Sequence, residues 1–393
     1  MTIVRKNFHL LAISTLLVSS PLGGAWAQPV DAALERLKAL VEEQSLKIDW
    51  QSADVSGSDV VLVGVQVGVE DSMAPIGNVT LTGISEVDQG YRVESIEFDT
   101  FRMEEGNGGV LVDEVSMTGV LLPDEGNQDV YGGFLFYENI TVGTIDVKAE
   151  GKQVVLFNDI NADITAPVDG KPMDFTGAVE SFSIDLSIIP EADQRAVLEA
   201  LGYLQLNGYM EMAGSWQPTD GRMALSQYDI TVTDAGTLGL TFDLGGYTPE
   251  LIASLREIQQ QMAANPGGDD AAQGLAMLGL LQQMTFHSAD ISFTDDSLTN
   301  KVIEFVAQMQ GMKPSDITNQ AKAVLPFVLA ELKNPELTTA VTRAVSSFLD
   351  NPGTLRVSAE PAEPVPFAQI MAGAMSEPQS LIGTLGVSVT AED

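Results

Sequence analysis

The feature that most constrains this chain is a two-residue alternation of apolar and polar positions, which recurs through residues 48–246. Its clearest stretch has valine at every odd position of residues 61–69, with Gly64, Gln66 and Gly68 among the residues between. Since successive strand residues point to opposite faces, such a segment buries one face and exposes the other to water. This pattern is typical of an antiparallel sheet with one solvated face, because parallel strands are buried on both faces.

The alternation returns in residues 154–164 and 204–216, so these segments are also predicted to be half-exposed strands. A Pro-Thr-Asp-Gly sequence at 218–221 and an Asp-Ala-Gly sequence at 234–236 separate the last three alternating segments. Both sequences are typical of tight turns, so we predict a three-strand meander there. In residues 91–98 the apolar positions change parity midway, which predicts either a β-bulge or a strand that passes between two core environments.

Helical periodicity is present after residue 28 and dominates beyond Gly246. Residues 30–47 carry an apolar stripe opposite a mixed-charge face that includes Arg36, which predicts a packing helix. A second helix is expected over 191–201, and two more follow Thr248 and precede residue 284. Three further amphipathic stripes consist of Leu298, Val302, Phe305, Val306 and Met309; of Ile317, Ala321, Val324, Val328 and Leu332; and of Leu337, Val341, Ala344, Val345 and Phe348.

Together these patterns predict an α+β fold: a long, mostly antiparallel and partly meandering sheet in the N-terminal two thirds, with amphipathic helices concentrated in the C-terminal third. Strands are also expected over 284–294, 354–359 and 386–390, with a short helix near Ile370. The predicted division of the chain is a cleavable signal peptide (1–27), an N-terminal packing helix (28–47), an antiparallel β-rich region (48–246) and a helix-rich region with closing strands, packed on the sheet (247–393).

Residues 1–27 have the three parts of an export signal. Arg5 and Lys6 are followed by an apolar run and then by Ala25-Trp26-Ala27, after which cleavage is predicted. The apolar run is shorter than the roughly 20 residues of a membrane span, so a cleaved signal is favoured over an uncleaved anchor. No integral span is expected after cleavage.

The mature chain is strongly acidic, because the signal removes two of 19 basic residues and none of the 55 acidic ones, leaving a net charge of −38. Such a field repels phosphate backbones and anionic headgroups, so nucleic acid is excluded as a partner. The chain has no cysteine, which fits a bacterial envelope better than a disulfide-rich secretory pathway. The predicted location is the periplasm, with secretion to the medium as the alternative.

Few catalytic chemistries remain open to this sequence. His287 is the only histidine after the signal, so a zinc site cannot be assembled within one chain, and no metal or other cofactor is expected. Signatures of serine hydrolases and of phosphate-binding loops are missing. By strand alternation His287 shares an apolar face with Ala289, Ile291 and Phe293, so we interpret it as a packed histidine and not as a general base.

Carboxylate catalysis stays possible, since a glycosidase needs only two acids about 5 to 10 Å apart. The acidic pairs of the sequence nevertheless have structural interpretations: one lies beside a glycine-rich turn and two precede helices, where acids stabilise the helix dipole. These pairs are Glu104-Glu105, Asp269-Asp270 and Asp295-Asp296. No catalytic, cofactor-binding or metal residue is therefore assigned.

Three functional hypotheses survive. The first is a non-enzymatic envelope protein that binds an apolar ligand or a protein partner on a one-sided sheet backed by helices. In strand character the chain resembles long periplasmic sheets that carry lipid, such as those of AsmA-type proteins; the resemblance is one of architecture, without a shared motif. The second is a carboxylate-dependent hydrolase of envelope glycans. The third is an assembly or adhesion component that uses strand addition at an open sheet edge.

Overall fold

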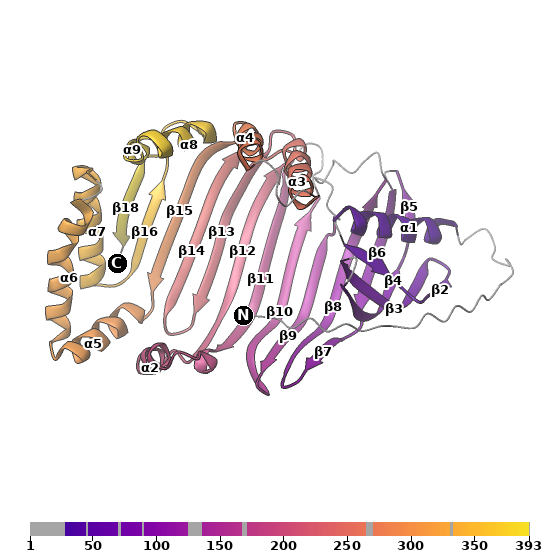
Figure 1. Cartoon of the computed structure of the whole chain (residues 1–393), viewed down its shortest axis with the longest axis horizontal. Helices are drawn as coiled ribbons and strands as arrows, with labels where there is room; N and C mark the ends of the chain where they lie inside the picture. The colour runs from indigo at the N-terminus through magenta and orange to yellow at the C-terminus, as the bar shows by residue number, and fades with distance from the viewer. Residues whose placement is uncertain are drawn as a thin grey trace.

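The structure is a computed structural model that describes residues 28–44, 46–69, 72–88, 90–124, 136–166, 171–264, 270–330 and 333–392. The signal segment 1–27 lies outside these residues. Eighteen strands of the described chain join in one antiparallel sheet, and the predicted α+β class is confirmed (Figure 1).

The sheet is a single meander in which the chain adds one strand after another. Its N-terminal part follows the helix α1 (Gln28–Glu43). The strands of this part are β1 (Lys47–Asp49), β2 (Ser52–Ser56), β3 (Asp59–Val69), β4 (Ser72–Thr82), β5 (Ser85–Val87), β6 (Gly90–Phe98), β7 (Phe101–Glu105) and β8 (Gly108–Pro123). In three places two consecutive strands pair with the same neighbouring strand. β1 and β2 both pair with β3, β4 and β5 both pair with β6, and β6 and β7 both pair with β8.

The central part consists of longer strands with few interruptions. They are β9 (Asn139–Ala149), β10 (Lys152–Thr165), β11 (Met173–Asp185), β12 (Gln205–Gln217), β13 (Arg222–Val232) and β14 (Gly236–Gly245), with α2 (Ala192–Leu201) between β11 and β12. The predicted meander is confirmed, because β12 pairs with β13 and β13 with β14. In β10 the outer half alternates between exposed and half-buried residues, as predicted for a half-exposed strand.

The C-terminal region contributes helices and also continues the sheet. The helices α3 (Pro249–Ala264) and α4 (Asp270–Leu281) precede β15 (Thr285–Asp295), and α5 (Leu298–Gln310), α6 (Pro314–Leu329) and α7 (Pro335–Asp350) follow it. The chain then forms β16 (Thr354–Ala359), β17 (Val365–Pro366), α8 (Phe367–Ser376), α9 (Ser380–Thr384) and β18 (Val387–Glu392). All these helices are inserted between strands, so they leave and rejoin the sheet at strand ends (Figure 1).

The tightest core lies under α1. Val30, Leu34 and Leu37 of this helix are buried against the first strands, where Leu62 and Val65 have no exposed surface. Arg36 was expected on the solvent side of α1, but it is 8% exposed. Its guanidinium donates to the Pro123 carbonyl at the end of β8 and to Glu43 of α1, which offsets part of the cost of burying the charge, while its Nη2 has no partner among the described residues.

The change of parity in residues 91–98 occurs without a register shift, because β6 keeps the same register with β4, β5 and β8 throughout. Val93 and Ile96 are both buried in the α1 core although they are three residues apart. Between them, Glu94 lies against Gly83, which has φ of +66°. Gly119 has φ of +61° and lies in the same way against Glu138. A left-handed residue is tolerated best as glycine, so these positions bend the strands and keep the apolar side chains on one face.

Candidate functional site

Register assigns every strand residue to one of two faces, because paired residues of neighbouring strands point to the same side. Between β14 and β15, Leu238 pairs with Phe293 and Phe242 with Ala289, while Thr241 pairs with Asp290. The first two pairs define the apolar face of the sheet and the third defines the polar face. The same assignment continues from strand to strand in both directions.

Between the strand ends of β9 to β15, the paired positions of the apolar face carry no charged side chain; the charged residues Lys152 and Asp295 pair at the ends, with Ala149 and Gly236. At these positions side chains are aliphatic, aromatic or methionine, with a few glycines and alanines between them. The larger members are Val142, Ile145, Phe157, Ile160, Ile164, Phe175, Val179, Met210, Met212, Tyr228, Ile230, Leu238, Leu240, Phe242 and Ile291. We call this set the central apolar face.

Helices pack on this side of the sheet at its two ends. At one end α1 covers the strands up to β8, and at the other α7 packs on β16 and β18, with Phe348 against Phe293 at a ring-centroid distance of 6.3 Å. Among the described residues no helix packs broadly across β9 to β14. Exposure varies along the face: Leu62 under α1 is 0% exposed, and Phe182 and Leu225 of the central strands are also buried, whereas Leu238 and Ile291 are 49% and 54% exposed. Most other members of the central apolar face are half-buried.

Large side chains lie flat over glycines on the central apolar face. A Cβ atom at Gly177 would lie 2.9 Å from the Met212 side chain, and one at Gly208 would lie 2.6 Å from the Phe182 ring. Gly214 is covered by the ring of Phe175 in the same way. At each of these glycines, an aromatic ring or a thioether from the neighbouring strand occupies the space of the absent side chain. Neighbouring strands therefore stay in contact there, and the face is flat.

Such a surface suits an apolar ligand chemically. Monomeric soluble proteins rarely leave contiguous apolar patches larger than a few hundred Å² in water, and larger patches mark binding sites. The side chains of the face can provide dispersion contacts to such a ligand. Trp216 at its edge donates from Nε1 to the Tyr247 carbonyl at 2.7 Å, so its polar atom is turned away to the backbone.

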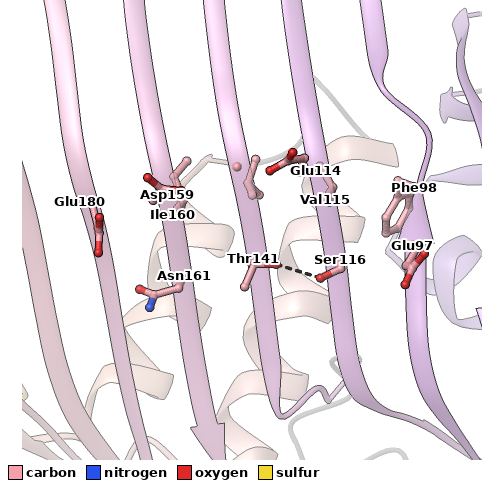
Figure 2. Close-up of a pocket in the computed structure, with 12 residues that line it drawn as sticks. Glu97, Phe98, Glu114, Val115, Ser116, Thr141, Asp159, Ile160, Asn161 and Glu180 are labelled. Carbon is pink, nitrogen blue, oxygen red and sulfur yellow. Dashed lines mark hydrogen bonds between the residues drawn. The ribbon is translucent and has the colours of Figure 1, made fainter.

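The polar face holds a pocket of about 440 Å³ at the junction of β6, β8, β9, β10 and β11. Four acids from different strands, Glu97, Glu114, Asp159 and Glu180, line it (Figure 2). Two of them, Glu114 and Asp159, have left-handed backbones with φ of +55° and +51°. Beside them a hydrogen bond of 2.8 Å joins the hydroxyls of Ser116 and Thr141, as Figure 2 shows.

This pocket is a poor setting for carboxylate catalysis. All four of its acids are exposed to solvent, whereas a catalytic acid of a glycosidase needs an environment that holds its proton at neutral pH. Within the described part of the chain, no three acidic or histidine side chains are grouped to hold a metal ion. The acids therefore fit a solvated face, whose charge keeps that side of the sheet in water.

The one acidic pair whose role the structure specifies is structural, as predicted. Asp295 ends β15, and its Oδ1 accepts hydrogen bonds from the backbone N–H and the hydroxyl of Thr299 at 2.8 and 2.7 Å. It thereby satisfies a free donor in the first turn of α5. Glu104 lies beside the β7–β8 turn and is exposed, while Asp269 lies outside the described residues.

His287 does not pack on the apolar face, so that prediction was wrong. A register shift between Asp243 and Leu244 inserts one extra residue into β15 at this point. The shift leaves Ala289 on the apolar side but turns His287 to the polar side, where its Nε2 lies 3.1 Å from the hydroxyl of Thr285. An unbroken two-residue alternation was assumed, and a β-bulge breaks it without any mark in the strand itself.

The surroundings of His287 lower its pKa from the ordinary value of 6.5. Partial burial is the main cause, the positive charge of Arg222 adds to it, and Asp243 opposes both. Asp243 is itself occupied by an ion pair with Arg222. Asp243 is therefore not free to orient the imidazole of His287 for proton transfer, and this supports a structural role for His287.

This depressed pKa makes a prediction for acid stability. The unfolded chain takes up the imidazole proton at a higher pH than the folded protein, so His287 contributes stability above about pH 6.5 that is lost as the pH falls through the folded-state value. His287→Gln should therefore lose less stability than the parent between pH 7.5 and pH 5, as measured by urea denaturation. Carboxylates contribute equally to both proteins, and equal losses would contradict the expected burial effect.

Comparison with known proteins adds little to this description. Residues 229–392, which include β14 to β18 and α3 to α9, match a family model described only as "Uncharacterized protein". No curated protein matches the chain in sequence. Among its described helices, none combines the length and apolar character that crossing a membrane requires.

Proposed function

We propose that this is an exported envelope protein without catalytic activity that binds an apolar ligand of the lipid class on the central apolar face. The observation that carries the proposal is the continuous apolar surface across β9 to β15, which no described helix covers broadly. The opposite face supports it as well, because its acids give the sheet a preferred orientation, with one side in water and one side available to ligand.

Energetics make a lipid a reasonable occupant. Each methylene removed from water contributes about 0.8 kcal/mol, so about ten methylenes laid on the face would supply roughly 8 kcal/mol, the free energy of a micromolar complex before immobilisation costs. Side chains such as Met210 and Met212 adapt to chains of different shape, since a thioether has many accessible rotamers. A periplasmic location, predicted from the signal, would give the protein access to envelope lipids.

The direct test is mass spectrometry of the molecules that extract with the protein, purified from its native host without detergent. We expect lipid at close to one or more molecules per chain. The Met212→Lys variant, purified in parallel, should carry much less, because a charge at the centre of the face opposes burial under an acyl chain. Protein that carries no apolar molecule and also fails to bind added fatty acid would refute the proposal.

The two alternatives have less support in the structure. A glycan hydrolase would have to use the exposed acids of the polar pocket, and turnover of envelope glycans by the purified protein would favour it. Strand addition would have to use an edge such as β2, where Ser52–Ser56 is exposed throughout. That strand is short and carries Asp54, both features that protect edges against pairing. Association that increases with protein concentration would favour this hypothesis.

A further inference from the structure

The helices α5 and α6 lie at the end of the sheet opposite α1 (Figure 1). They carry a second exposed apolar surface. This surface differs from the rest of the chain in its low content of acidic residues. The protein has 55 acidic and 19 basic residues, yet residues 298–330 contain only Glu304 and Asp316 against Lys301, Lys313 and Lys322. This segment is close to neutral in a chain of net charge −36, so the repulsion that the rest of the surface exerts on other molecules is locally weakest here.

The exposure of α6 departs from the stripe predicted for it. Val324 and Val328 were expected to pack, but they are 49% and 62% exposed, and Phe327 is 79% exposed; Leu332 lies outside the described residues. The helix instead turns Leu325 and Leu329 inward. Both sides of α6 are apolar in residues 323–330, since this stretch has no polar side chain. We call Val324, Phe327 and Val328 the α6 apolar patch.

Internal contacts hold this helix in place and leave the patch outward. The ammonium of Lys322 pairs with Asp350 at the end of α7, and the hydroxyl of Thr338 in α7 donates to the Leu329 carbonyl at 3.3 Å. Beneath α6, α7 packs on the sheet through Phe348. At this end of the molecule α7 packs on the sheet and α6 packs on α7, so the patch lies on the side of α6 that faces away from α7.

We propose that the α6 apolar patch docks on the surface of a neutral lipid bilayer. Three neighbouring side chains at positions i, i+3 and i+4 of a helix insert together into the headgroup boundary, as in helices that lie on membranes. The low local charge lets the helix approach, while the acids of the polar face stay in water because their desolvation is costly. A second copy is a less suitable occupant, because each copy brings a net charge of −36.

This inference goes beyond the proposed function, because it concerns a different surface and holds whether or not the sheet binds lipid. Its test uses the absence of cysteine, which makes one introduced thiol unique. Ala323→Cys places a polarity-sensitive fluorophore beside the patch and keeps Phe327 and Val328. Ala53→Cys on β2 is the matched control, since it is the same substitution at an exposed position near the far end of the sheet.

With phosphatidylcholine vesicles, the label at position 323 should shift to the blue and the label at position 53 should not. Adding anionic phosphatidylglycerol to the vesicles should weaken the shift, because the chain is acidic. In vesicle flotation, Phe327→Ser should lower the partition coefficient at least about tenfold, the fold-change expected for one buried aromatic ring. Val328→Ser should lower it less, and Val55→Ser, a matched change on β2, should leave it unchanged.

Two outcomes would overturn the proposal. One is a folded Ala323→Cys protein whose label does not respond to vesicles at any lipid concentration. The other is a blue shift without vesicles that grows with protein concentration and accompanies dimers in sedimentation, which would assign the patch to a second copy. Fatty-acid binding in solution tests the proposed sheet function separately: Phe327→Ser should leave it unchanged and Met212→Lys should weaken it. A parent protein that binds vesicles but no fatty acid would contradict the sheet function alone.

Discussion

Met212→Lys is expected to weaken binding of a fluorescent long-chain fatty acid about a hundredfold, as measured by titration of the purified protein. Met212 lies in the middle of β12, pairs with Tyr228, and its side chain lies over Gly177 on the central apolar face. A bound acyl chain there would have to desolvate the ammonium. The side chains are similar in length, so the fold tolerates the change, and lysine can extend its amine to water only when no ligand covers it.

The matched control is Ala213→Lys, which introduces the same charge one residue further along the same strand. Ala213 pairs with Gln227 on the polar face, so its lysine points away from the ligand surface. We expect its dissociation constant to stay within about twofold of that of the parent, an effect typical of a distant, independent site. Equal weakening by both lysines would mean that the added charge acts through the net charge of the protein and not through the face.

Much of the fold could be predicted because local chemistry specifies it. The alternation of residues 61–69 predicted a one-sided strand, and the turns at 218–221 and 234–236 predicted the β12–β14 meander. Helix starts were predictable for the same reason. The hydroxyl of Thr248 accepts from the Leu251 N–H at 3.3 Å, and the Asn334 side chain accepts from the Leu337 N–H at 3.0 Å.

Other features depend on partners that a single strand or helix does not encode. The β-bulge at His287 arises from the pairing of β15 with β14, so strand alternation alone placed this residue on the wrong face. Residues 323–330 of α6 are apolar on all sides, so helical periodicity could not tell the packed side from the exposed one. The left-handed backbones of Glu114 and Asp159, which shape the polar pocket, have no sequence signal, because neither is glycine.

The candidate site illustrates the same limit. Periodicity predicted that one face of the sheet is apolar, and the structure confirms the apolar pairs. Periodicity could not predict what covers that face. The apolar stripe of a helix and the apolar face of a strand look the same in sequence whether or not the two pack against each other. Helices expected to back the sheet lie mainly at its ends and edges, with α1 and α7 the described ones that cover it most. The stretch between them, which no described helix covers broadly, is the surface to which we propose that the ligand binds.

The coverage of the face can be measured by the same substitution at two places. Leu62→Ala should destabilise the protein by about 3 to 5 kcal/mol, because Leu62 is fully buried under α1 and its removal leaves a cavity. Leu238→Ala should cost less than about 1 kcal/mol, since water already reaches half of that side chain. Urea denaturation gives both values, and hydrogen exchange in β3 and β14 shows whether the N-terminal and central parts of the sheet unfold separately. Similar costs for the two variants would mean that the central apolar face is covered in solution. If the face instead binds lipid, saturating fatty acid should raise the cost of Leu238→Ala and leave that of Leu62→Ala unchanged, because a ligand stabilises the folded state only through the contacts that it makes.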